Sequence, residues 1–195
     1  MFNFRDDTLL CSSFLSKNEC NLDTKESDMI KYKSGLIELE QFIIALIEKA
    51  LSRGMVNIVT NAETGWVELS AKKFVPGVIP FLQQVNVFSA RSLYEYRFPN
   101  SPLLWKFHCF KERLDLILKN EHKWKNIISM GDSHVEREAI RSVSNEYLNI
   151  HTKSIKFSDR PSQDQLKKQI ELIIKCFDHI CNFNGPLDLQ LKVSN

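Results

Sequence analysis

The sequence predicts an α/β fold: a three-layer, Rossmann-like parallel sheet with helices on both faces. Strand-like and helix-like segments alternate along the whole chain, which favours parallel strands joined by helical crossovers. The segments at residues 55–60 and 126–130 are mostly apolar, as is typical of strands covered on both faces. The length of 195 residues, with 43% hydrophobic and 26% charged residues, suits one globular domain. We therefore expect a single domain over residues 1–195.

The overall composition excludes several classes of protein. The net charge is +2, which gives no nucleic-acid-binding footprint. No apolar run approaches the roughly 18 residues of a membrane span. The five cysteines are odd in number and have no Cys-x-x-Cys spacing, so reduced thiols in a cytoplasmic protein are expected.

The first half of the chain predicts two strands and a long helix. Residues 1–5 form a short apolar segment that is expected to be a strand. Residues 16–34 are polar and predict a loop or flap, a feature that often lies beside a functional site. Ser34 is expected to cap a helix that runs to Arg53, with apolar residues at spacings of three and four, and Gly54 ends it. Residues 55–60 follow as a buried strand.

The second half continues the alternation. Residues 85–90 predict a third strand, residues 91–102 a loop with aromatic anchors, residues 103–120 a helix and residues 126–130 a fourth strand. Residues 152–157 alternate apolar residues with lysines, which favours an edge strand. Ser162 and Gln165 match a capping box for a helix through about Phe183. Residues 184–195 are expected to be a C-terminal tail, in which residues 187–191 are a short strand or extended chain.

Polar residues gather where the predicted strands end, and ligands of open α/β sheets bind at that edge. The candidate site residues are Asp6, Thr8, Thr60, Asn61, Lys106, Asp132 and Glu136. Carboxylates at such an edge suit a hard cation such as Mg²⁺. Each residue also has a simpler interpretation: a capping aspartate, a strand-end hydroxyl or a solvated lysine.

Four of these segments, in this order, resemble the motifs of the haloacid dehalogenase-like (HAD) superfamily, most of whose members are magnesium-dependent phosphatases. Asp-Asp-Thr-Leu at residues 6–9 resembles the end of the first motif, Asp-x-Asp-x-Thr. Val-Thr-Asn at 59–61 resembles the second motif, Lys106 the third, and Gly-Asp-Ser-His-Val-Glu at 131–136 the fourth. Residues 60–70 and 156–162 also resemble uncharacterised HAD-like proteins of single-celled eukaryotes.

This resemblance implies a role for each matched residue. Asp6 would stand at the position of the general acid and base, and Thr60, Asn61 and Lys106 would bind phosphate oxygens. Asp6, Asp132 and Glu136 would be the ligands of Mg²⁺. These roles are chemically reasonable for a reaction through an aspartyl phosphate.

The first motif departs from the family at its most important position. If Thr8 is the motif threonine, the nucleophilic aspartate is replaced by Phe4. A phenyl ring has no lone pair with which to attack phosphorus and no oxygen to bind a metal. Shifting the register does not restore the pair of aspartates, because Asp6 would then need an acid at Thr8 and Asp7 one at Leu9.

Three functions follow as alternatives. The first is a HAD-fold pseudophosphatase that is a binding or structural component of a larger assembly, with a protein as its partner. The second is an active Mg²⁺-dependent phosphatase that acts on a phosphoprotein or a small phosphate ester. The third is hydrolysis by a metal-held water near Asp132. The chain leaves little room for a large cap, and uncapped relatives in this family usually act on large substrates.

Overall fold

The computed structural model describes residues 2–4, 7–118, 125–148 and 150–192, with side chains from residue 7 onward. The first half of the chain contains β1 (Phe2–Phe4), α1 (Ser12–Lys17), α2 (Glu26–Leu51), β2 (Val56–Thr60), α3 (Trp66–Phe74), η1 (Pro76–Val78), α4 (Ile79–Leu82), β3 (Asn86–Ser89) and α5 (Ala90–Tyr94). The second half contains α6 (Pro102–Leu118), β4 (Lys125–Gly131), α7 (His134–Ser144), β5 (Ile150–Lys156), α8 (Gln163–Asn182) and β6 (Leu187–Gln190).

These strands form one six-stranded sheet in the order β3-β2-β1-β4-β5-β6, and every pair is parallel. β1 lies in the middle: Phe4 is opposite Ile58 of β2, and Phe2 is opposite Ile128 of β4. The chain runs outward from β1 in one direction and then, from β4, in the other. A doubly wound sheet has its ligand crevice at such a reversal, beyond the carboxyl ends of the strands. The topology therefore marks the loops after β1 and β4.

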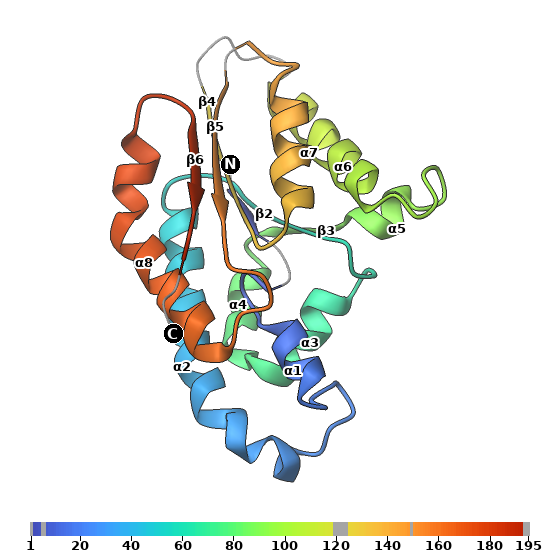
Figure 1. Cartoon of the computed structure of the whole chain (residues 1–195), viewed down its shortest axis with the longest axis vertical. Helices are drawn as coiled ribbons and strands as arrows, with labels where there is room; N and C mark the ends of the chain where they lie inside the picture. The colour runs from blue at the N-terminus through green and yellow to red at the C-terminus, as the bar shows by residue number, and fades with distance from the viewer. Residues whose placement is uncertain (1, 5–6, 119–124, 149, 193–195) are drawn as a thin grey trace.

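Helices cover both faces of the sheet, as predicted (Figure 1). Val56 and Ile58 of β2 face the larger core, which α2, α8, α3 and α4 cover. Val59 points to the opposite face and packs with Trp105 and Ile140 from the layer of α5, α6 and α7. Successive residues of one strand thus serve two cores, which explains why this strand is buried along its whole length.

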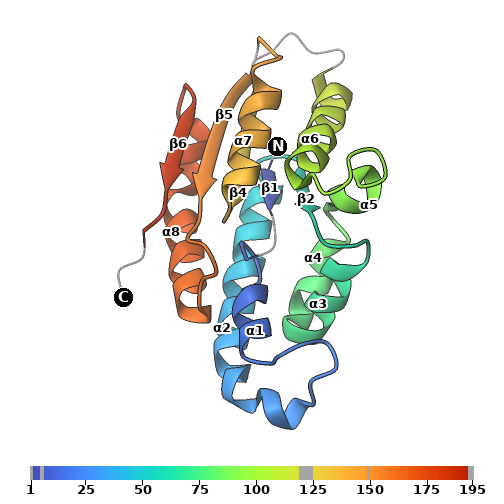
Figure 2. The ribbon, with the colours of Figure 1, turned by 45° about the vertical axis from the view of Figure 1, so that its right-hand side comes forward.

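Helix α2 is longer than the sheet that it covers. Its 26 residues span about 39 Å at the usual rise per residue, whereas a strand of seven residues spans about 23 Å. The surplus lies beyond the carboxyl ends of the strands, together with α1 and α3 (Figures 1 and 2). These three helices form a small helical lobe over that edge of the sheet.

The helical lobe corrects the prediction of a loop over residues 16–34. Helix α2 begins at Glu26, and its N-cap residue is Lys25 rather than Ser34. The sequence in this region is polar because the first turns of α2 are largely exposed, and only Met29 and Tyr32 are buried there. The polar sequence of this segment therefore reflects the exposure of the first turns of α2, not the absence of a helix.

The prediction of an edge position for residues 152–157 is also wrong. β6 pairs with β5 along its outer side, so residues 187–190 of the predicted tail complete the sheet. Lys153 of β5 is fully buried, and its ammonium donates to the carbonyl oxygens of Ile180, Cys181 and Phe183 at 2.6, 3.0 and 2.7 Å. The lysine thereby binds the carboxyl end of α8, where backbone carbonyls need donors and a positive charge is favourable.

The remaining differences are smaller. Residues 91–102 include most of α5, whose N-cap Ser89 accepts a hydrogen bond from the Ser92 amide. Helix α8 has the predicted capping box of Ser162 and Gln165. Among the described residues, none of the helices combines the length and apolarity that a bilayer crossing requires.

Candidate functional site

A polar cleft lies at the reversal point of the sheet, beyond the carboxyl ends of β1, β4 and β5. Its volume is about 680 Å³, within the range of small-molecule sites. Loops after three strands and the first residues of three helices line it. The lining residues are Asp7, Ser12, Ser13, Trp66, Asp132, Ser133, His134, Asp159 and Arg160.

The turn after β1 is fixed by Asp7. This residue has a φ of 51°, in the left-handed region that aspartate tolerates better than most residues. Its buried carboxylate accepts hydrogen bonds from the Ser13 amide at 2.9 Å and from the Ser12 hydroxyl at 3.2 Å. Asp7 thus satisfies donors at the start of α1 and aligns that helix against the cleft.

The loop after β4 is fixed by a capping box at the start of α7. The Ser133 hydroxyl accepts from the Val135 amide, and one Glu136 oxygen, Oε2, accepts from the amide and the hydroxyl of Ser133 at 3.2 and 2.6 Å. An added Cβ at Gly131 would lie 3.0 Å from Glu136 Cγ, so the glycine allows the strand to turn into the helix close to this side chain. Glu136 is therefore held inward, and Asp132 lines the cleft.

Lys106 and Glu136 form a buried ion pair beneath the cleft. The Lys106 ammonium lies 2.8 Å from the second Glu136 oxygen, Oε1, and donates to the carbonyl of Val59 at 3.0 Å. The lysine is fully buried and Glu136 nearly so, at 0% and 3% exposed. Pairing is what makes burial of both charges tolerable. The residues that resemble the third and fourth motifs thus contact one another directly.

Thr60 and Asn61 end β2 as predicted, but they differ in their contacts. Thr60 is buried, and its hydroxyl accepts a hydrogen bond from the Ala62 amide at 2.9 Å, within its own turn. The side-chain oxygen of Asn61 is buried with no hydrogen-bond partner among the described residues. An acceptor left in this state costs roughly 1–3 kcal/mol. Asn61 is therefore the residue of the predicted phosphate-binding set whose side-chain acceptor is unsatisfied.

The described residues fit Mg²⁺ poorly. Both oxygens of Glu136 already have partners, one Lys106 and the other Ser133, so a metal there would share the carboxylate with an ammonium whose positive charge opposes it. Within the part of the chain that the structure describes, no three His, Cys, Asp or Glu side chains are grouped for metal binding. Asp6, the third predicted ligand, lies outside the described residues, as does the side chain of Phe4.

Cys11 lies at the N-terminal cap of α1, next to Ser12 of the cleft, and its thiol is buried. Burial raises the pKa of its thiol to about 12, and the charge of Asp7 acts in the same direction. The reactive form of cysteine is the thiolate, which is scarce at neutral pH when the pKa is this high. Burial therefore disfavours the thiolate of Cys11.

Several cleft residues were not predicted as site residues. Trp66, the first residue of α3, and His134, the exposed first residue of α7, both line the cleft. Asp159 and Arg160 follow β5, and both line the cleft. Asp159 also forms an ion pair with the buried Lys156 ammonium at 2.7 Å. The available signal was their place after a strand: any loop at a carboxyl end of this sheet is a candidate to line the site.

The fold and cleft define an α/β protein with a doubly wound parallel sheet and a polar site at its carboxyl edge. Comparisons with family models, curated protein sequences and solved structures found no match.

Proposed function

We propose that the protein is a HAD-like pseudophosphatase: a single-domain binding or structural component of a larger assembly, without phosphatase turnover. The observation that carries this proposal is the residue at the end of β1. Phe4 is the last residue of the central strand, opposite Ile58, two residues before Asp6. An enzyme of the resembled family attacks phosphorus from this position, and phenylalanine has no group for that step.

The contacts of Lys106 support the same proposal. A lysine that binds phosphate needs donors directed at the ligand, and an ammonium has three. In this protein Glu136 and the Val59 carbonyl each contact the Lys106 ammonium, and the side chain is fully buried. The charge is thus used inside the fold, where it joins α6 to α7 and β2.

A reducing compartment such as the cytoplasm fits this protein, because all five cysteines are unpaired.

The second candidate function is the Mg²⁺-dependent phosphatase acting through an aspartyl phosphate. Its support is Asp132, which lines the cleft directly after β4, where the fourth motif of the family supplies a metal ligand. Phe4 and the engaged oxygens of Glu136 count against it.

Hydrolysis of an aryl phosphate with and without Mg²⁺ separates the two candidates. We expect the protein to show no turnover above that of buffer. Phe4→Asp restores the missing carboxylate, and Phe4→Asp/Asp132→Asn is its matched control. Activity gained in the first variant and lost in the second would support a degenerate HAD site.

Turnover by the unmodified chain at about 1 s⁻¹ or faster, in the range of ordinary enzymes, would refute the proposal if Asp132→Asn abolishes it. That result would establish the phosphatase alternative.

A further inference from the structure

The helical lobe also has a concave surface whose lining residues differ from those of the polar cleft. This groove, of about 320 Å³, runs between α2 and α3 and continues to η1. It shares no lining residue with the polar cleft. The groove residues are Glu26, Met29, Lys33, Leu36, Ile37, Glu40, Lys72, Lys73, Phe74 and Pro76.

The floor of the groove is apolar. Met29, Leu36 and Phe74 are buried in the larger core, and they form its outer surface at this point. Ile37 is 50% exposed at the edge, and Ile30, two turns earlier on the same side of α2, is 68% exposed. An apolar strip of this kind on a helix suits the apolar face of another helix, which contacts a groove through residues at spacings of three, four and seven.

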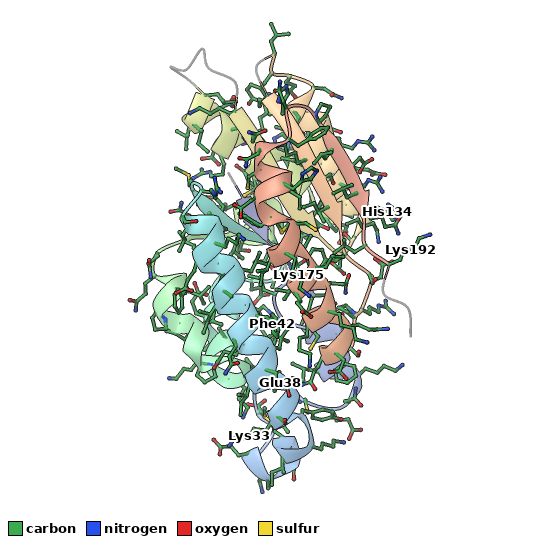
Figure 3. The ribbon with its side chains drawn as sticks, turned by 90° about the vertical axis from the view of Figure 1, so that its left-hand side faces the viewer. Lys33, Glu38, Phe42, His134, Lys175 and Lys192 are labelled. Carbon is green, nitrogen blue, oxygen red and sulfur yellow. The ribbon has the colours of Figure 1, made fainter. Side chains whose placement is uncertain are left out.

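The rims of the groove carry positive charge on both sides. Lys33 stands on α2, and Lys72 and Lys73 stand in the last turn of α3. Figure 3 shows Lys33 on the half of α2 that extends past the sheet, away from Lys175 on α8. No carboxylate of the described chain forms an ion pair with any of these three lysines. Lys73 donates to the Thr24 carbonyl at 2.6 Å, so the exposed Lys33 and Lys72 are the charges best placed to meet a partner.

Neither of the two acidic residues of the groove forms an ion pair with a rim lysine. Glu40 accepts the Gly77 amide at 2.6 Å, and the close approach of these residues leaves no room for a side chain at Gly77. Glu26 lies at the far end, in the first turn of α2, where a carboxylate interacts favourably with the helix dipole. Both carboxylates therefore have a role inside the protein.

We propose that this groove binds an acidic amphipathic helix of a partner protein. Apolar side chains of that helix pack on Met29, Leu36 and Ile37, and its flanking carboxylates pair with the rim lysines. Charge complementarity of this kind directs the approach of a partner and selects against a basic helix. The inference does not depend on the loss of hydrolysis, because the groove is separate from the polar cleft.

The test uses two synthetic helical peptides and the full chain. One peptide has leucine at positions spaced by three and four residues with glutamate on both flanks, and the other has lysine in place of each glutamate. Binding is measured by fluorescence anisotropy at two salt concentrations. We expect the glutamate peptide to bind about tenfold more tightly or better than the lysine peptide, and to weaken with salt.

Two variants locate the binding. Lys33→Glu/Lys72→Glu should weaken the glutamate peptide by about tenfold or more, since two rim attractions become repulsions. Lys175→Glu is the matched control, because it reverses an exposed charge on α8, outside the groove, and should change nothing. All three positions are exposed, so circular dichroism should report an unchanged fold. Failure of both peptides to bind, equal binding of the two peptides, or an unchanged affinity in the double variant would overturn the proposal.

Discussion

Replacing Lys153 with methionine tests the most unusual contact of the fold. Methionine keeps most of the length and apolar volume of the side chain but removes the ammonium. The carbonyls of Ile180, Cys181 and Phe183 then lose a donor at 2.6, 3.0 and 2.7 Å, inside a region where the lysine itself is fully buried. We expect a large loss of stability without loss of the fold.

The expected size follows from the contacts. A buried acceptor left without a partner costs about 1–3 kcal/mol, and the last turn of a helix gains up to about 2 kcal/mol from a buried cation. Burial lowers the pKa of Lys153, which reflects the cost of placing an ammonium there, and methionine is free of that cost. Three lost acceptor contacts, reduced by this relief, give a decrease of about 3 kcal/mol in the free energy of unfolding.

Urea denaturation followed by circular dichroism measures this change. At about 2–3 kcal/mol per molar urea, the midpoint should fall by about 1 M. Lys175→Met is the matched control: Lys175 is exposed and pairs with Glu171 one turn away, so its loss should cost less than about 0.5 kcal/mol. A Lys153→Met midpoint equal to that of the control would refute the reasoning, because the carbonyls would then be satisfied in another way.

Three further outcomes are expected. A thiol reagent should label exposed Cys176 in the native protein and Cys11 only after unfolding, because burial raises the pKa of Cys11 to about 12; rapid native labelling of Cys11 would contradict its burial. Burial lowers the pKa of His108 below its ordinary value of 6.5, so the unfolded state binds this proton more tightly and stability falls as the pH drops below about 6.5. His108→Gln should flatten that pH dependence in urea titrations at pH 5 and pH 7, and an unchanged slope would exclude the histidine as its source. Glu136→Gln should lower the unfolding free energy by about 3 kcal/mol, since the buried Lys106 ammonium loses an anion, whereas a change below about 0.5 kcal/mol would show that the pair contributes little.

The architecture was predictable where periodicity and capping agreed. The buried strand before Gly131 and the capping box at Ser162 both appear in the structure as expected, because each depends on neighbours within a few residues. The doubly wound sheet followed from the alternation of such segments. Local signals are sufficient for this level of description.

The errors occurred where distant contacts decide the structure. The lysine at 153 indicated an exposed edge, yet the carboxyl end of α8 provides buried acceptors for it. No local pattern indicates that the end of a helix, 27 to 30 residues further along the chain, will supply those carbonyls. The start of α2 was missed because its first turns extend past the sheet, where a helix needs few apolar residues.

The candidate site was predictable as positions and less so as contacts. Strand ends correctly indicated that Asp132 would line a cleft, but they could not indicate that Glu136 would turn inward to Lys106. The inward orientation of Glu136 depends on its close approach to Gly131 and on the burial of Lys106 on α6. Both are properties of the assembled fold. Arg160 lines the cleft from the loop after β5 and Trp66 from the first turn of α3, and neither residue was among the predicted site residues.

The central place of β1 has a consequence for the order of events during synthesis. Phe2 pairs with Ile128, so the two strands that flank the middle of the sheet are separated by most of the chain. While the first part of the chain emerges, β1 has β2 as a neighbour but an open edge where β4 belongs. Pairings across such long sequence separations form slowly, and an unpaired strand edge invites association with other chains. We therefore expect the central pairing of β1 with β4 to form only after residue 131 has been made, as a late step in folding.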